Sequence, residues 1–202
     1  QMMVEINDMQ IMKVLADATN KISEGEVLQL LNSHNPDISE KHYFKVIEFK
    51  TAQLFEACGS IAGLINNTDK KTIQAYAKIG HHFGLIFQIA DDILDYSGKP
   101  NEIGKNIGND LSEGKVTLPL IYTIQKSNEN QKEMIKNSIK TGDISKLSEI
   151  TQIMEDNNIV KTVKISAEKH IIEIKKILDE LGPHENNNII VNLAEHSINR
   201  NY

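Results

Sequence analysis

Apolar residues recur at intervals of three and four along most of this chain, the spacing of a helix that buries one face. The alternation of apolar and polar residues that is typical of β-strands is hard to find. The pattern therefore predicts an all-α protein. It predicts helices over residues 3–23, continuing or restarting past Gly25 to residue 31, then 40–65, 68–96, about 117–127, 130–141, 143–156, 159–181 and 186 to the end.

Capping and turn-forming residues mark the ends of the 68–96 helix. Thr68 and Asp69 are both candidate N-caps, because their side chains can accept hydrogen bonds from the first backbone N–H groups. Gly98 and Pro100 are stop signals just beyond the last turn. Residues 101–115 are polar and contain several glycines, so we expect a loop there.

Composition narrows the class of protein. The chain has 202 residues, of which 40% are hydrophobic, so we expect a single domain with one core. The net charge of −6 indicates no nucleic-acid partner, which would need a basic patch. The single cysteine suits a reducing compartment and predicts a cytoplasmic protein. No apolar run is long enough to predict an integral membrane segment.

Three aspartates interrupt an apolar helix pattern in "FQIADDILDY". At 100° per residue, Asp95 lies about 40° and Asp92 about 100° from Asp91, with Gln88 between them at about 60°. One wall of an otherwise apolar helix is therefore acidic. The flanks are apolar on nearly every side, which disfavours the alternative of a solvated surface face.

Close carboxylates repel one another unless protons or a cation intervene. A hard cation such as Mg²⁺ prefers oxygen ligands, few of them from protein, with phosphate and water completing its shell. The acidic wall therefore favours a site for Mg²⁺ and a phosphate group. Gly84, at about 20° on the same wheel, leaves space beneath the acids.

Lys50 is a second anomaly, because the wheel centres it on the apolar face of the 40–65 helix. The apolar residues within about 60° of it are Tyr43, Val46, Ile47, Leu54, Ala57 and Ile61. A buried ammonium is costly without a counter-charge. The side chain can extend to solvent, form an intramolecular salt bridge, or reach into a cavity toward a phosphate, with Thr51 beside it.

Two further lysines, Lys105 and Lys115, each follow a glycine in "GKPNEIGKNIGNDLSEGK". The glycine spacing and the residues after each lysine exclude a P-loop. Taken alone, these lysines fit solvated loop charges as well as phosphate ligands.

The quoted motifs carry a family resemblance. "FQIADDILDY" followed by "GKNIGNDLSEGKVTLPLIY" resembles the second aspartate-rich region of the trans-isoprenyl (polyprenyl) diphosphate synthases. "ISEGEVLQLL" and "FKTAQLFEACGSIAG" resemble the two preceding helices of that family. Four stretches agree in order and spacing, and the likeness is greatest to bacterial members that make the octaprenyl side chain of quinones.

The resemblance implies helices packed around a deep central cavity, and a homodimer. It implies Mg²⁺-dependent condensation of an allylic diphosphate, such as farnesyl diphosphate, with isopentenyl diphosphate. The residues matched by motif are Asp91, Asp92 and Asp95 for the metal, Lys50, Lys105 and Lys115 for the allylic diphosphate, and Thr51, Phe87 and Gln88 for isopentenyl diphosphate; Asp91, Asp92 and Lys50 would carry the catalysis.

The family's first aspartate-rich motif and its basic cluster for isopentenyl diphosphate are not in the 202 residues. We therefore expect the C-terminal part of a longer synthase, inactive by itself. Two alternatives stay open: a non-catalytic helical subunit of a hetero-oligomeric synthase, and a class I terpene cyclase. The intact aspartates and the Lys50–Thr51 pair disfavour the first, and the paired loop lysines disfavour the second.

Overall fold

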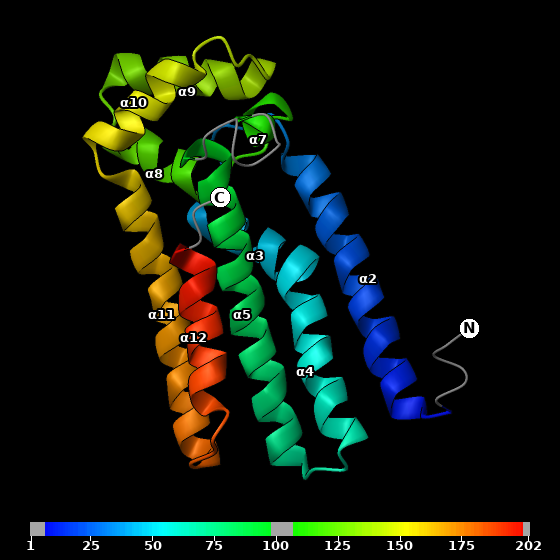
Figure 1. Ribbon diagram of the computed structural model, residues 1–202. Helices are drawn as coiled ribbons and strands as arrows, with labels where there is room; N and C mark the ends of the chain where they lie inside the picture. Colours follow the sequence, from blue (N-terminus) through cyan, green and yellow to red (C-terminus); the bar gives the residue numbers. More distant parts are fainter. Residues whose placement is uncertain (1–6, 98–106, 200–202) are drawn as a thin grey trace.

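The computed structural model describes residues 7–97 and 107–199, and every regular element within them is helical. The prediction of an all-α fold is thus confirmed. The long helices α2, α4, α5, α11 and α12 run alongside one another, and α9 and α10 cross one end of the bundle (Figure 1). The helices of the described part are too short or too polar to cross a lipid bilayer.

The helix bounds follow. They are α2 Met9–Asn32, α3 Glu40–Ile47, the π-helical turn η1 Glu48–Ala52, α4 Gln53–Ile65, α5 Lys70–Ser97, α7 Asn109–Ser112, α8 Leu118–Lys126, α9 Glu129–Thr141, α10 Leu147–Asp156, α11 Ile159–Leu181 and α12 Asn187–Asn199.

Most predicted helices are present at the expected places. Asp69 caps α5 as expected, with its Oδ1 accepting the backbone N–H groups of Lys71 at 2.8 Å and Thr72 at 3.0 Å. The predicted 159–181 helix coincides with α11. The first helix continues through Gly25 to Asn32 without a break. One helix was missed, because α7 lies in the segment that we expected to be a loop.

The predicted 40–65 helix is continuous but contains the π-helical turn η1, which carries Lys50 and Thr51. Short π-helical turns within α-helices are frequent at functional sites. Two glycines pack against this turn. A Cβ at Gly25 of α2 would lie 2.6 Å from the Lys50 backbone nitrogen, and one at Gly84 of α5 would lie 2.6 Å from the Ala52 Cα. Gly84 therefore brings α5 against η1 and does not open space beneath the acids as we expected.

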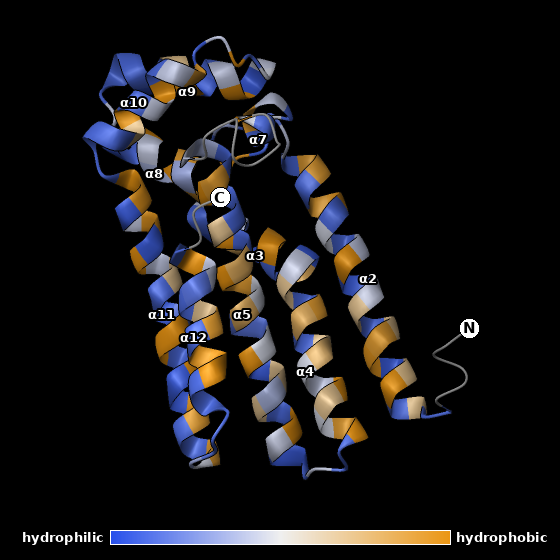
Figure 2. Ribbon diagram, viewed as in Figure 1, coloured by the Kyte–Doolittle hydropathy of each residue, from blue (hydrophilic) through white to orange (hydrophobic). Residues whose placement is uncertain are grey.

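The core lies where α5 packs against α4 on one side and α11 on the other. Ile86 and Ile89 of α5 and Ile174 of α11 are fully buried there. In Figure 2, α4 is more hydrophobic along its length than α11, whose ribbon alternates between hydrophilic and hydrophobic residues. The burial of α5 on several sides holds its acidic end in a fixed position.

Two histidines join α5 to α11. The Nδ1 atoms of His82 and His170 lie 3.1 Å apart, so one ring donates a hydrogen bond to the other. Burial lowers the pKa of His170 to about 4, and the neighbouring His82 acts in the same direction. Burial also lowers the pKa of His82. Both rings are therefore neutral in the folded protein near neutral pH.

We expect this pair to make the protein sensitive to mild acid. The unfolded chain binds protons first, because its histidine pKa is about 6.5. The contribution of the pair to stability is complete above that value and is lost as the pH falls from about 6.5 toward 4. Between pH 7 and pH 5, the melting temperature of the His170→Gln variant should therefore fall by less than that of the wild type. His196→Gln, which changes an exposed histidine, is the control. A His170→Gln effect that does not vary with pH would contradict this account.

Candidate active site

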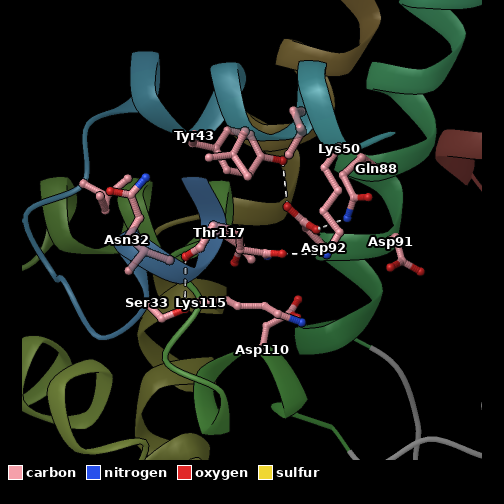
Figure 3. Close-up of a pocket in the computed structure, with 15 residues that line it drawn as sticks. Asn32, Ser33, Tyr43, Lys50, Gln88, Asp91, Asp92, Asp110, Lys115 and Thr117 are labelled. Atoms are coloured by element: carbon pink, nitrogen blue, oxygen red, sulfur yellow. Dashed lines mark hydrogen bonds and ion pairs between the residues drawn. The ribbon is translucent and has the colours of Figure 1, made fainter. Parts of the chain in front are cut away.

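A cavity of about 220 Å³ lies between α2, α3, η1 and the C-terminal half of α5. The segment that follows α7 closes its remaining side (Figure 3). Its polar lining consists of Gln29, Asn32, Ser33, Tyr43, Lys50, Gln88, Asp91, Asp92, Asp110, Lys115 and Thr117. Four predicted site residues of α5 and η1 thus meet at one cavity, together with the predicted Lys115.

Asp91 and Asp92 both line this cavity. Asp91 is half-buried, whereas only 2% of the Asp92 surface is exposed. The Asp92 carboxylate accepts hydrogen bonds from the Tyr43 hydroxyl at 2.7 Å and from the Gln88 amide nitrogen at 2.8 Å. The two adjacent acids therefore differ, since Asp92 is fixed within the wall and Asp91 stands closer to its surface.

Asp95 is not among the residues that line the cavity. Its two carboxylate oxygens accept the backbone N–H groups of Asn109 at 3.1 Å and Asp110 at 3.0 Å, at the start of α7. Asp95 thereby ties the end of α5 to α7. Asp95 therefore lies outside the cavity lining that Asp91 and Asp92 share, although the charge of Asp91 acts on it.

Asp110 takes the cavity position that we had expected of Asp95. It lines the cavity, and its Oδ1 lies 3.3 Å from the Nζ atom of Lys115, which also contacts Glu113 at 2.6 Å. Asp110 was not among the predicted site residues. The available signal was an acid five residues before Lys115 in a glycine-rich segment, and we interpreted that segment only as a polar loop.

The acids at this end of α5 destabilise one another's ionised forms. Burial raises the pKa of Asp92 to about 8 and that of Asp95 to about 6, and the charge of Asp110 adds to both shifts. Burial raises the pKa of Asp110 too, although Lys115 opposes this. A cation in the cavity would relieve this repulsion.

Lys50 satisfies two of the interpretations that its sequence position allowed. Its side chain is 30% exposed, lines the cavity, and places Nζ 3.2 Å from Glu26 Oε1 and 2.5 Å from Gln29 Oε1. The ammonium group is thus neither fully buried nor without a counter-charge. The ammonium group is held at the cavity by a salt bridge to α2 and stays partly accessible.

The remaining predicted residues differ in position. The Thr51 hydroxyl donates a hydrogen bond to Gln88 Oε1 at 2.8 Å, which holds the two side chains together beside the cavity. The ring of Phe87 packs near that of Phe55, with centroids 5.5 Å apart, and is not among the cavity-lining residues. Lys105 lies outside the described residues.

The donor set fits a hard cation bound together with a phosphate. Within the described ranges, no group of three or more His, Cys, Asp or Glu side chains is arranged to hold a metal ion. Mg²⁺ does not need such a group, because it commonly takes one or two carboxylates and completes its shell with water and substrate phosphates. Asp91, Asp92 and Asp110 would supply the carboxylate oxygens for such a cation, and Lys50 and Lys115 would supply positive charge for an anion.

The fold of this chain is similar to that of solved polyprenyl synthases. The polyprenyl synthase from Caulobacter crescentus CB15, complexed with calcium and isoprenyl diphosphate, is 31% identical with a TM-score of 0.93. The decaprenyl diphosphate synthase from Rhodobacter capsulatus is 34% identical with a TM-score of 0.88. Each comparison covers 99% of this chain and 62% of the solved chain.

This chain belongs to the polyprenyl synthetase family, whose model matches residues 1–157. The octaprenyl diphosphate synthase of Haemophilus influenzae is 34% identical over 203 residues, which cover 100% of this chain and 62% of that protein. The octaprenyl diphosphate synthase of Escherichia coli K12 is 40% identical over 142 residues, covering 70% of this chain and 44% of that protein. The chain thus spans less than two thirds of the length of these relatives.

Proposed function

We propose that this chain is the metal-binding part of a trans-prenyltransferase that joins an allylic diphosphate, such as farnesyl diphosphate, to isopentenyl diphosphate. One observation carries the proposal: acids from α5 and α7 and lysines from η1 and the segment after α7 converge on a single cavity. Membership of the polyprenyl synthetase family supports the same reaction.

The acidic side chains have two roles in this proposal, which are binding the metal ion and positioning α7. Asp91 and Asp92 hold a divalent cation, which we take to be Mg²⁺, and Asp110 adds an acid to the same wall. Asp95 contributes by holding α7. When bound, the cation neutralises the charge that develops on the departing diphosphate.

The cations of the chain act on the same leaving group. Lys50 and Lys115 donate hydrogen bonds to the diphosphate and favour the transition state in which its bond to the allylic carbon breaks. Lys105 is assigned to this role by its motif alone. Thr51 and Gln88 border the site for isopentenyl diphosphate, and the hydrogen bond between them fixes the positions of both side chains.

An octaprenyl product for a quinone side chain is the finer part of the proposal, supported by the octaprenyl diphosphate synthases among the relatives. A homodimer and a cytoplasmic location are also part of this proposal. The single cysteine supports the location, because disulfides are rare in reducing compartments.

The test is metal-dependent ligand binding by the 202-residue chain, because one aspartate-rich motif is present in it. Calorimetry with Mg²⁺ and a non-hydrolysable farnesyl diphosphate analogue should show that each ligand binds tightly only in the presence of the other. Farnesol, which lacks the diphosphate, is the control and should not promote Mg²⁺ binding. Equal Mg²⁺ affinity with and without the analogue would reject the proposed function.

A further inference from the structure

Tyr43 is a buried residue of α3 that reaches across to the acidic wall of α5. Only 4% of its surface is exposed, and its hydroxyl donates to Asp92 Oδ2 at 2.7 Å (Figure 3). The sequence placed this tyrosine on the apolar face of its helix and assigned it no role at the site. The structure gives it a polar contact with a predicted metal ligand.

Gln88 engages the other oxygen of the same carboxylate. Its amide nitrogen donates to Asp92 Oδ1 at 2.8 Å, while its Oε1 accepts the Thr51 hydroxyl at 2.8 Å. The Asp92 carboxylate is thus held at both oxygens, from α3 on one side and from its own helix on the other. Rotation about its side-chain bonds would break both hydrogen bonds.

A carboxylate has about four lone-pair positions, and these two donors use one on each oxygen. Asp92 is almost completely buried, yet it lines the cavity, so its remaining lone pairs have the cavity beside them. A buried carboxylate whose remaining acceptor positions have no donor is costly unless a cation or further donors are bound beside it. Metal-ligating carboxylates are commonly oriented by hydrogen bonds of this kind.

We propose that Tyr43 is a positioning residue of the metal–diphosphate site, which holds the Asp92 carboxylate in the orientation that presents its remaining lone pairs to the cation. This inference rests on the proposed function. The inference adds a site residue from α3, a helix in which the sequence predicted none. The Asp92 carboxylate then connects Tyr43 to the hydrogen-bonded pair Gln88 and Thr51.

The test compares Tyr43→Phe with the wild-type chain. Phenylalanine keeps the buried ring and removes only the hydroxyl, so the variant is expected to fold, which circular dichroism checks. The affinity for Mg²⁺ in the presence of the farnesyl diphosphate analogue should fall roughly 10- to 100-fold, the usual loss when a group that orients a metal ligand is removed. Calorimetry gives this affinity without any need for turnover.

Tyr122→Phe is the matched control. The Tyr122 hydroxyl also donates to a carboxylate, Glu40 Oε1 at 3.0 Å, but Tyr122 is not among the cavity-lining residues. Its removal should leave the metal affinity unchanged. A purely structural effect of losing a tyrosine–carboxylate hydrogen bond would lower the melting temperature of both variants and the metal affinity of neither.

A double-mutant cycle shows whether Tyr43 acts through Asp92. Once Asp92→Asn is present, adding Tyr43→Phe should cause no further loss of metal affinity. Wild-type affinity in Tyr43→Phe, or an undiminished further loss in the double variant, would overturn the inference and leave the proposed function standing. A wild-type chain without metal-dependent diphosphate binding would overturn both.

Discussion

The variant Asp91→Asn should lose Mg²⁺-dependent binding of the farnesyl diphosphate analogue, with the largest effect of any single change at the site. Asp91 lines the cavity at the surface of the acidic wall, and the amide keeps its size but removes the charge that a hard cation requires. We expect a loss of about 3 kcal/mol, roughly 100-fold, in the affinity for the metal–diphosphate pair. Calorimetry on the 202-residue chain measures it.

The control for Asp91→Asn is Asp17→Asn, the same change at an acid on α2 whose side chain is 64% exposed. In a protein that spans the full length of the relatives, Asp91→Asn should lower kcat by a similar factor, because the cation stabilises the transition state. An unchanged kcat at saturating Mg²⁺ would show that Asp91 has no part in metal binding.

The variant Lys50→Met should bind the analogue far more weakly while remaining almost as stable as the wild type. Charge-assisted hydrogen bonds contribute about 1.5–3 kcal/mol, so we expect roughly a 10- to 100-fold loss of affinity. The change leaves Glu26 without its partner, but the Glu26 side chain is 50% exposed, and pairs of this kind contribute about 0–1 kcal/mol. Melting curves and a binding titration on the same variant give both quantities.

Lys41→Met, at an exposed lysine of α3, is the matched control and should change neither quantity. If Lys50→Met instead unfolds at a much lower temperature and still binds the analogue, the lysine is a structural group. The two results separate a ligand for the diphosphate from one half of a salt bridge.

The helices could be predicted because their signals are local. Asp69 precedes its helix as an N-cap, and the apolar spacing of residues 159–181 alone defines α11. The π-helical turn has no comparable signal. The helical wheel therefore treated residues 40–65 as one regular helix and placed Leu54 on the buried face with Tyr43 and Lys50. Leu54 is 48% exposed, because the wider turn shifts the phase of α4 relative to α3.

Site residues that lie on one helix could be predicted from the sequence. Site residues that come together from several helices were harder to predict. Asp91, Asp92 and Gln88 share one helix, so their spacing alone placed them together. The roles of Asp95 and Asp110 depend on α7, a four-residue helix that has little hydrophobic pattern to reveal it. The contact between Tyr43 and Asp92 joins residues 49 positions apart in the chain, and no local rule predicts such a pair.

The π-helical turn also limits which changes of length this chain can accept. A one-residue deletion within Glu48–Ala52 would convert η1 into a regular α-helical turn and leave the phase of α4 nearly unchanged, whereas an insertion or a second deletion would rotate all of α4 by about 100° relative to α3. Gly59 of α4, against which the Tyr76 carbonyl packs closely, would then face elsewhere. The exposed turn between α11 and α12 does not fix the rotation of one helix relative to the other in this way. Insertions and deletions should therefore be tolerated at that turn, whereas the stretch from α3 to α4 should accept no insertion and no loss beyond the one extra residue of η1.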